Sequence, residues 1–85
     1  MTSEQMLQQA AAIISERGAA YGHAAASMST VAARWSITLG HGVTPAQVVL
    51  CMIDLKLVRL AYDPTHQDSV LDVIGYAALL PEVVR

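Results

Sequence analysis

The chain has 85 residues, enough for one domain built around a single core. Its formal net charge is -2 and only 14% of its residues are charged, which excludes the basic face of a protein that binds duplex nucleic acid. A single cysteine, Cys51, excludes an internal disulfide, and no Cys/His spacing of a structural zinc site occurs. Since 54% of the residues are apolar and so short a chain buries only about two-thirds of its unfolded surface, the composition predicts a homo-oligomer.

A first helix is predicted over about residues 3–17, with Thr2 as its N-cap and Gln5 completing a capping box. Gly18 is expected to end this helix. Its inward stripe is formed by Met6, Ala10, Ile13 and Ile14. The N-terminal segment has no basic stretch followed by an apolar run, so we expect no signal peptide and a cytoplasmic protein.

A second helix is predicted over about residues 23–39, and the Gly40-His41-Gly42 turn is expected to end it. Its inward stripe is formed by Met28, Val31, Ala32, Trp35 and Leu39. The three histidines, His23, His41 and His66, are scattered along the chain. Each is therefore predicted to be solvated or to cap a helix, and no metal site is predicted.

A third helix is predicted over about residues 45–62, with Thr44 as N-cap and Pro45 in the first turn. Apolar residues from Val48 to Leu60 cover nearly its whole circumference, so it needs cover on all sides. We expect this range, with part of the fourth helix, to contact a second copy of the chain. A central helix wrapped within the monomer is the alternative. Cys51 lies in this run and is expected to be buried, and the run is too short to cross a membrane.

A fourth helix is predicted over about residues 66–80, with Thr65 as N-cap and Asp68 beside the positive end of the helix dipole. Pro81 is expected to mark its end or a kink. No segment shows the two-residue alternation of a strand. The sequence therefore predicts an all-α fold, a single four-helix bundle-like domain over residues 1–85 with short loops.

The few charged and polar residues of the third and fourth helices form two stripes. Lys56 and Arg59 are three residues apart, and Asp68, Asp72 and Tyr76 follow one another at intervals of four, so each set shares one helix face. An antiparallel hairpin of the two helices would bring the stripes together. One interpretation is an internal network of ion pairs tied off by the tyrosine hydroxyl. The other is a pocket whose cations hold phosphate and whose acids hold a base, a sugar or a metal.

Three motifs run along most of the chain: Arg17-Gly18-x-x-Tyr21-Gly22, Lys56-x-x-Arg59-Leu60 and Asp68-Ser69-x-x-Asp72-x-x-Gly75-Tyr76. On these motifs the chain resembles a family of small proteins of unassigned function from tailed phages and prophages. That family is in turn distantly similar to the MazG-type all-α nucleotide pyrophosphohydrolases. In those enzymes Glu-x-x-Glu on one helix and Glu-x-x-Asp on the next hold Mg²⁺ over a nucleoside triphosphate. The resemblance implies a MazG-like fold, a nucleotide ligand and the cytoplasm of a bacterial host.

The chain departs from the enzyme pattern at the metal ligands. Asp72 stands where the enzymes have their aspartate, but the acid three residues earlier is Ser69. Lys56-x-x-Arg59 replaces Glu-x-x-Glu, so the charge of that pair is reversed. Cations at these positions repel Mg²⁺ and suit phosphate instead. No cofactor is therefore certain, and Mg²⁺ is the one that the resemblance implies.

Three hypotheses of function follow. The first is an oligomeric phage-type protein that binds a nucleotide or a nucleotide-derived ligand without robust pyrophosphohydrolase activity; its ligand-binding residues would be Lys56, Arg59, Asp68, Asp72, Tyr76 and Tyr21. The second is a Mg²⁺-dependent nucleotide pyrophosphohydrolase whose site is shared between subunits: Asp68 and Asp72 of one chain would act with acids from another copy, Glu16 among them. The third is a structural or adaptor protein in which the charges form only an internal network. Tyr21 is expected either to cover a ligand or to fill the corner between the first and second helices.

Overall fold

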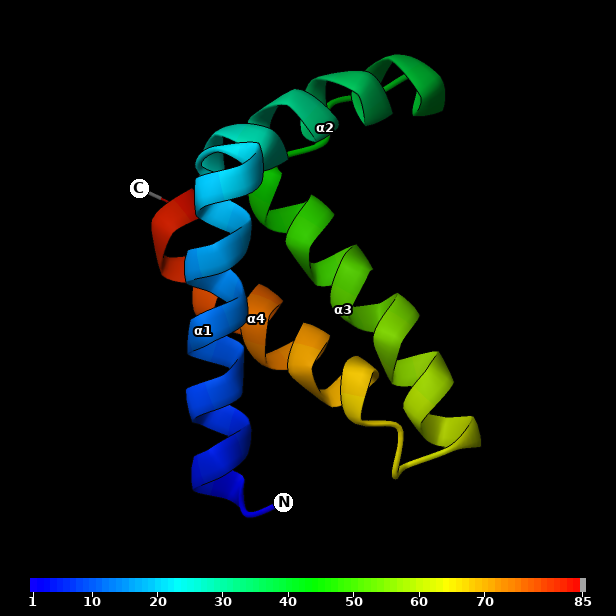
Figure 1. The fold of residues 1–85 in the computed structure, drawn as a ribbon. Helices are drawn as coiled ribbons and strands as arrows, with labels where there is room; N and C mark the ends of the chain where they lie inside the picture. Colours follow the sequence, from blue (N-terminus) through cyan, green and yellow to red (C-terminus); the bar gives the residue numbers. More distant parts are fainter. Residues whose placement is uncertain (85) are drawn as a thin grey trace.

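The computed structural model describes residues 1–84, apart from the side chain of Tyr21. Its four helices are α1 (Ser3–Tyr21), α2 (Ala24–Leu39), α3 (Pro45–Tyr62) and α4 (Gln67–Val83), and residues 1–84 contain no strand (Figure 1). The all-helical prediction is confirmed. Within the same residues, no helix combines the length and the hydropathy that crossing a membrane requires.

Two of the predicted N-caps form in full. The hydroxyl oxygen of Thr2 accepts the backbone N–H of Gln5 at 3.1 Å, and the Gln5 side chain accepts the Thr2 N–H at 2.8 Å. Thr44 and Gln47 make the same reciprocal pair at 3.1 and 2.9 Å. These boxes satisfy backbone donors that the first turn of a helix leaves unpaired, and they set the starts of α1 and α3.

The end of α1 differs from the prediction. Gly18 does not end the helix, which continues to Tyr21 and stops at Gly22. Gly22 adopts φ 84° and ψ -171°, a conformation essentially restricted to glycine. A glycine inside a helix costs only about 1 kcal/mol relative to alanine, which is too little to end α1 at Gly18 by itself.

Both ends of α4 also differ from the prediction. Thr65 is not the N-cap, because its N–H and hydroxyl both donate to the Asp63 carboxylate, at 3.0 and 2.7 Å. His66 takes that position, and its Nδ1 accepts the Ser69 N–H at 3.3 Å. At the other end, α4 runs through Pro81 to Val83. Proline removes one helical hydrogen bond, but its fixed φ allows the last turn to continue.

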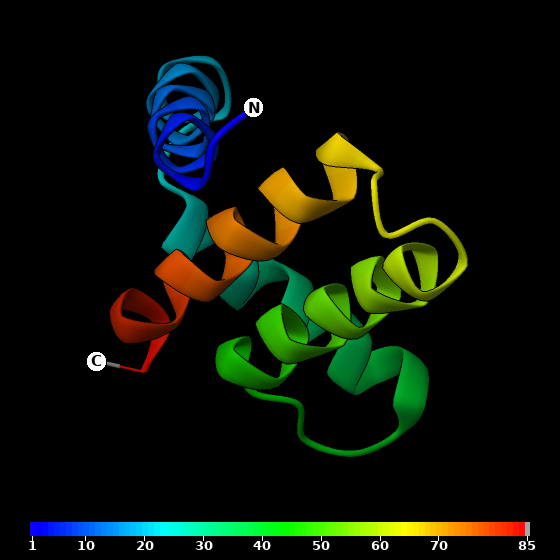
Figure 2. The ribbon, with the colours of Figure 1, turned by 90° about the horizontal axis from the view of Figure 1, so that it is seen from below.

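The helices are arranged around α4, which contacts all three others. α3 and α4 form the expected hairpin and diverge from the loop that joins them, while α2 crosses the first half of α3 (Figure 1). In Figure 2, seen from below, α4 lies between α1 and α3. α1 therefore packs against the far side of α4, at its C-terminal half.

The packing is open. The core is formed by Ala10, Ala32, Val48, Val49, Leu71 and Leu79. The accessible surface is 5829 Å², whereas a compact protein of this mass exposes about 4,900 Å². The radius of gyration is 13.6 Å, against about 12 Å for a compact domain of this length. The four helices thus form an incompletely closed bundle.

The open packing corrects three predictions of burial. Ile14 and Leu39 lie on the predicted inward stripes but are exposed, because no neighbouring helix covers the end of α2 or that edge of α1. Cys51 was expected to be buried and is exposed. Val48 and Val49 are fully buried within the chain, so this part of the predicted oligomer contact faces the molecule's own core.

Candidate functional site

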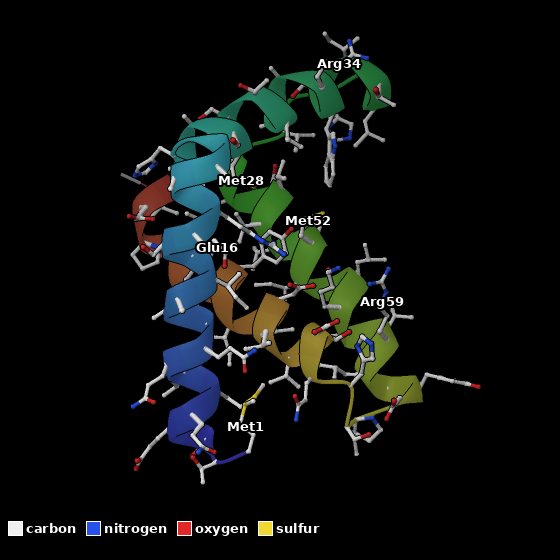
Figure 3. The ribbon with its side chains drawn as sticks, viewed as in Figure 1. Met1, Glu16, Met28, Arg34, Met52 and Arg59 are labelled. Carbon is white, nitrogen blue, oxygen red and sulfur yellow. The ribbon has the colours of Figure 1, made fainter. Side chains whose placement is uncertain are left out.

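A groove of about 650 Å³ runs between α1, the start of α2 and α4. α4 supplies Asp72, Gly75 and Tyr76, whose spacing of three and four residues places them on one side of the helix. Met28 comes from α2 near its junction with α1 (Figure 3). The groove also exposes an apolar floor, formed by Ala10, Ile13, Ile14, Leu71, Ala78 and Leu79.

Residues of two distant motifs meet in this groove. Arg17, Gly18 and Gly22 line it from the end of α1 and the following loop. Asp72, Gly75 and Tyr76 line it from α4. About fifty residues separate the two motifs along the chain, and they come together because α1 lies across the second half of α4. The fold therefore gathers into one concavity most of the residues of the first and third motifs.

Gly75 lies well inside α4, where glycine is less favourable than alanine by about 1 kcal/mol. A Cβ atom built at this position meets no heavy atom within 4 Å, so tight packing does not require glycine here. The position instead opens onto the groove. The missing side chain widens the groove beside Asp72 and Tyr76.

One ion pair joins α3 to the site among the described residues. Lys56 Nζ lies 3.2 Å from Asp72 Oδ2, and the two side chains are 12% and 26% exposed. Lys56 approaches from α3 and does not line the groove, whereas Asp72 does. The contact therefore holds the carboxylate in place from behind, and it realises one pair of the network that the sequence suggested.

The other predicted site residues lie elsewhere. Arg59 is exposed, on the side of α3 that faces away from α1 (Figure 3), and Asp68 is exposed in the first turn of α4. Neither side chain makes an ion pair or a hydrogen bond within residues 1–84. The stripes meet at Lys56 and Asp72 alone because only the facing edges of α3 and α4 touch, and Arg59 and Asp68 lie off those edges. The side chain of Tyr21, a predicted ligand contact, lies outside the described part of the chain.

Three residues of the groove with titratable side chains were not predicted as site residues: Arg17, His23 and Glu82. Arg17 belongs to the first motif, which was the available signal. His23 caps α2, as expected of the scattered histidines, with its Nδ1 accepting the Ala25 N–H at 3.3 Å. Glu82 lies beyond the predicted end of the fourth helix, and only the continuation of α4 through Pro81 brings it to the groove.

The carboxylates do not converge. Within the described residues, no group of three or more histidine, cysteine, aspartate or glutamate side chains is close enough to hold a metal ion. Asp72 is already engaged by a cation, and Glu16 lines a separate, smaller hollow of about 340 Å³ together with Arg17. The hard-oxygen cluster that a two-metal phosphohydrolase needs is not assembled by these residues.

Comparison with known proteins shows which family the chain belongs to. Residues 5–84 match a family described as "Domain of unknown function (DUF6378)". The chain belongs to this family. A relative in Mycobacterium phage L5, "Gene 55 protein", is 35% identical over 69 residues. The alignment covers 80% of this DUF6378 chain and 44% of the phage protein, so the chain matches less than half of that relative's length. No solved structure matches the chain.

Proposed function

We propose that the chain binds a nucleotide or a nucleotide-derived ligand in the groove between α1 and α4. The convergence of Arg17, Asp72 and Tyr76 on one groove carries this proposal. Its volume of about 650 Å³ lies within the roughly 300–1,000 Å³ of small-molecule sites. An apolar floor with a few polar groups at its rim is the composition that such sites share.

Each polar residue suits one part of a nucleotide. The planar guanidinium of Arg17 offers paired donors that match a phosphate. Tyr76 offers an aromatic face and a hydroxyl beside the apolar floor. Asp72, held by Lys56, offers an acceptor for sugar hydroxyls or a base amino group. Arg17 thus takes the phosphate role that the sequence had suggested for Lys56 and Arg59, and Lys56 becomes a positioning residue.

Binding rather than hydrolysis follows from the donor set. The MazG-type mechanism that the sequence resemblance suggests needs several carboxylates around Mg²⁺. In the groove, Asp72 is neutralised by Lys56, and Glu82 is the one other carboxylate among the described lining residues. A hydrolase would need further acids from another copy of the chain. We therefore propose a ligand-binding protein of the phage-type DUF6378 family, with hydrolysis as an outcome that the experiment below distinguishes.

The experiment measures thermal unfolding with nucleoside mono-, di- and triphosphates, with and without Mg²⁺. A ligand at a hundred times its Kd stabilises the folded state by about 2.7 kcal/mol, which raises the Tm of a chain this small by roughly 10–20 °C. Arg17→Ala should abolish the shift, whereas Arg34→Ala, which removes an exposed arginine of α2 outside the groove (Figure 3), should preserve it. If no nucleotide raises the Tm, the proposal fails. Equal shifts in both variants would place the ligand elsewhere, and Mg²⁺-dependent phosphate or pyrophosphate release would favour the hydrolase.

A second variant separates binding from folding. Gly75→Leu replaces a helical glycine with a better helix former in open space, so the free protein should be as stable as the wild type or more stable. The new side chain would fill the groove beside Tyr76. We expect the Kd for the nucleotide to rise by at least about tenfold, since that corresponds to only about 1.4 kcal/mol. Unchanged affinity in a folded Gly75→Leu protein would contradict a ligand in this groove.

A further inference from the structure

The two faces of α3 differ in their exposure to solvent. The residues turned toward α2 and α4 are buried or half-buried: Val48, Val49, Met52, Ile53, Lys56 and Leu60. The opposite side is exposed and nevertheless apolar over most of its length. Exposed apolar patches of this kind mark contact sites on soluble proteins. The intrachain packing therefore accounts for only half of the apolar circumference of α3.

Four exposed residues on this side, Cys51, Leu55, Val58 and Tyr62, recur at spacings of four, three and four. We call them the outer seam. This alternation of spacings is the one by which two helices pack side by side. Val58 is 70% and Tyr62 is 95% exposed, so a large part of the seam meets solvent in the single chain.

The two charges nearest the seam have opposite signs and lie on opposite flanks. Asp54 precedes Leu55 on one flank, and Arg59 follows Val58 on the other. They are five residues apart, which is the offset at which flanking residues of two parallel helices meet across a seam. In an antiparallel pair, the Asp54 flank of one helix would face the Asp54 flank of the other, and the two Arg59 flanks would also face each other. Neither charge would then have a partner of opposite sign.

The chain also exposes more surface than a compact monomer, as a subunit of a dimer would. The chain exposes roughly 900 Å² more than a compact protein of its mass. A standard protein interface buries about 800 Å² on each partner. The excess belongs to the whole chain, and the exposed side chains of α3, among them Val58 and Tyr62, supply part of what one subunit contributes to a stable dimer.

We propose that two copies of the chain pair through the outer seam, with their α3 helices side by side and parallel. Asp54 of each copy then lies beside Arg59 of the other, and the two Cys51 side chains face each other across the two-fold axis. This interface differs from the predicted range of Val48 to Leu60, because it uses only the exposed side of α3 and extends to Tyr62. It leaves out α4, which contacts the inner side of α3.

The first test measures the mass of the full chain in solution by sedimentation or light scattering. We expect twice the 9.1 kDa of one chain at micromolar concentration. Val58→Glu should raise the Kd of the dimer by at least about tenfold, because it places a charge in the seam. Ile37→Glu is the matched control, since Ile37 is also 70% exposed but lies on α2. A monomeric wild type, or a dimer that Ile37→Glu dissociates and Val58→Glu does not, would overturn the proposal.

Two further measurements test the parallel arrangement. Diamide, which takes up the electrons and protons of the two thiols, should join Cys51 to Cys51 of the second copy, and Val58→Glu should slow this cross-linking. Asp54→Arg and Arg59→Asp should each weaken the dimer by about tenfold, while the double exchange restores it. A dimer that does not cross-link, or that the double exchange fails to restore, would rule out the parallel pairing. Far-UV circular dichroism checks that each variant is folded, and Tyr62→Glu repeats the seam test at a nearly fully exposed position.

Discussion

Removing Lys56 tests whether the ion pair with Asp72 holds α3 and α4 together. At 3.2 Å the attraction is about 1 kcal/mol at the dielectric constant of water and about 5 kcal/mol at an effective dielectric constant of 20. The cost of desolvating a lysine that is only 12% exposed offsets much of the larger value. Lys56→Met keeps most of the aliphatic stem and leaves the carboxylate unpaired. We therefore expect the free energy of unfolding to fall by about 2 kcal/mol, which lowers the Tm by roughly 8–16 °C.

A double-mutant cycle isolates the pair. Lys56→Met, Asp72→Asn and the double variant are unfolded in urea and followed by far-UV circular dichroism, all at one protein concentration because a dimer would make stability depend on it. The expected coupling energy is about 1–2 kcal/mol. Arg34→Met, at an exposed position, should change stability by less than about 0.5 kcal/mol. A coupling energy below about 0.5 kcal/mol would refute the view that this ion pair holds α3 and α4 together.

Three other predictions concern local structure. Gly40→Ala should destabilise the fold by about 1 kcal/mol in urea unfolding, because Gly40 ends α2 at φ 77°, whereas Gly42→Ala, where φ is not positive, should be nearly neutral. Hydrogen bonds from the hydroxyl and N–H of Thr65 lower the pKa of Asp63 below its ordinary value of 3.8. The ionised Asp63 therefore stabilises the fold above pH 3.8, and this stabilisation is lost as the pH falls through the pKa of the folded state. The loss of stability with falling pH should be less steep in Asp63→Asn. Ser69→Ala should cost about 1 kcal/mol, because the Ser69 hydroxyl is buried and lies 2.7 Å from the N-cap imidazole of α4; an unchanged Tm would contradict this assignment.

The candidate site was predictable in part. The third motif identified Asp72, Gly75 and Tyr76, and all three line the groove. Lys56 was placed correctly beside Asp72 because residues on facing edges of a helical hairpin meet. Arg59 was grouped with Lys56 on helical spacing alone. Arg59 follows Lys56 by three residues, so its side chain is rotated by about 60° around the helix axis relative to that of Lys56. This rotation is enough to leave Arg59 in solvent.

The sequence by itself determined the four helices and most of their ends, because these depend on neighbouring residues. The Thr2 and Thr44 capping boxes, Pro45 and the turn at Gly40 each act within a few residues of chain. It also predicted that α3 has more apolar surface than one small chain can cover, and the structure leaves Leu55, Val58 and Tyr62 exposed.

Only the tertiary structure decided which surfaces meet, because that depends on the angles at which the helices cross. The passage of α1 over the far side of α4 brings Arg17 to Tyr76 around one groove. The packing of α2 and α4 against one face of α3 buries Val48 and leaves Val58 exposed on the other face of the same helix. Helical periodicity tells which residues share a face, and the packing of the whole chain tells what that face touches.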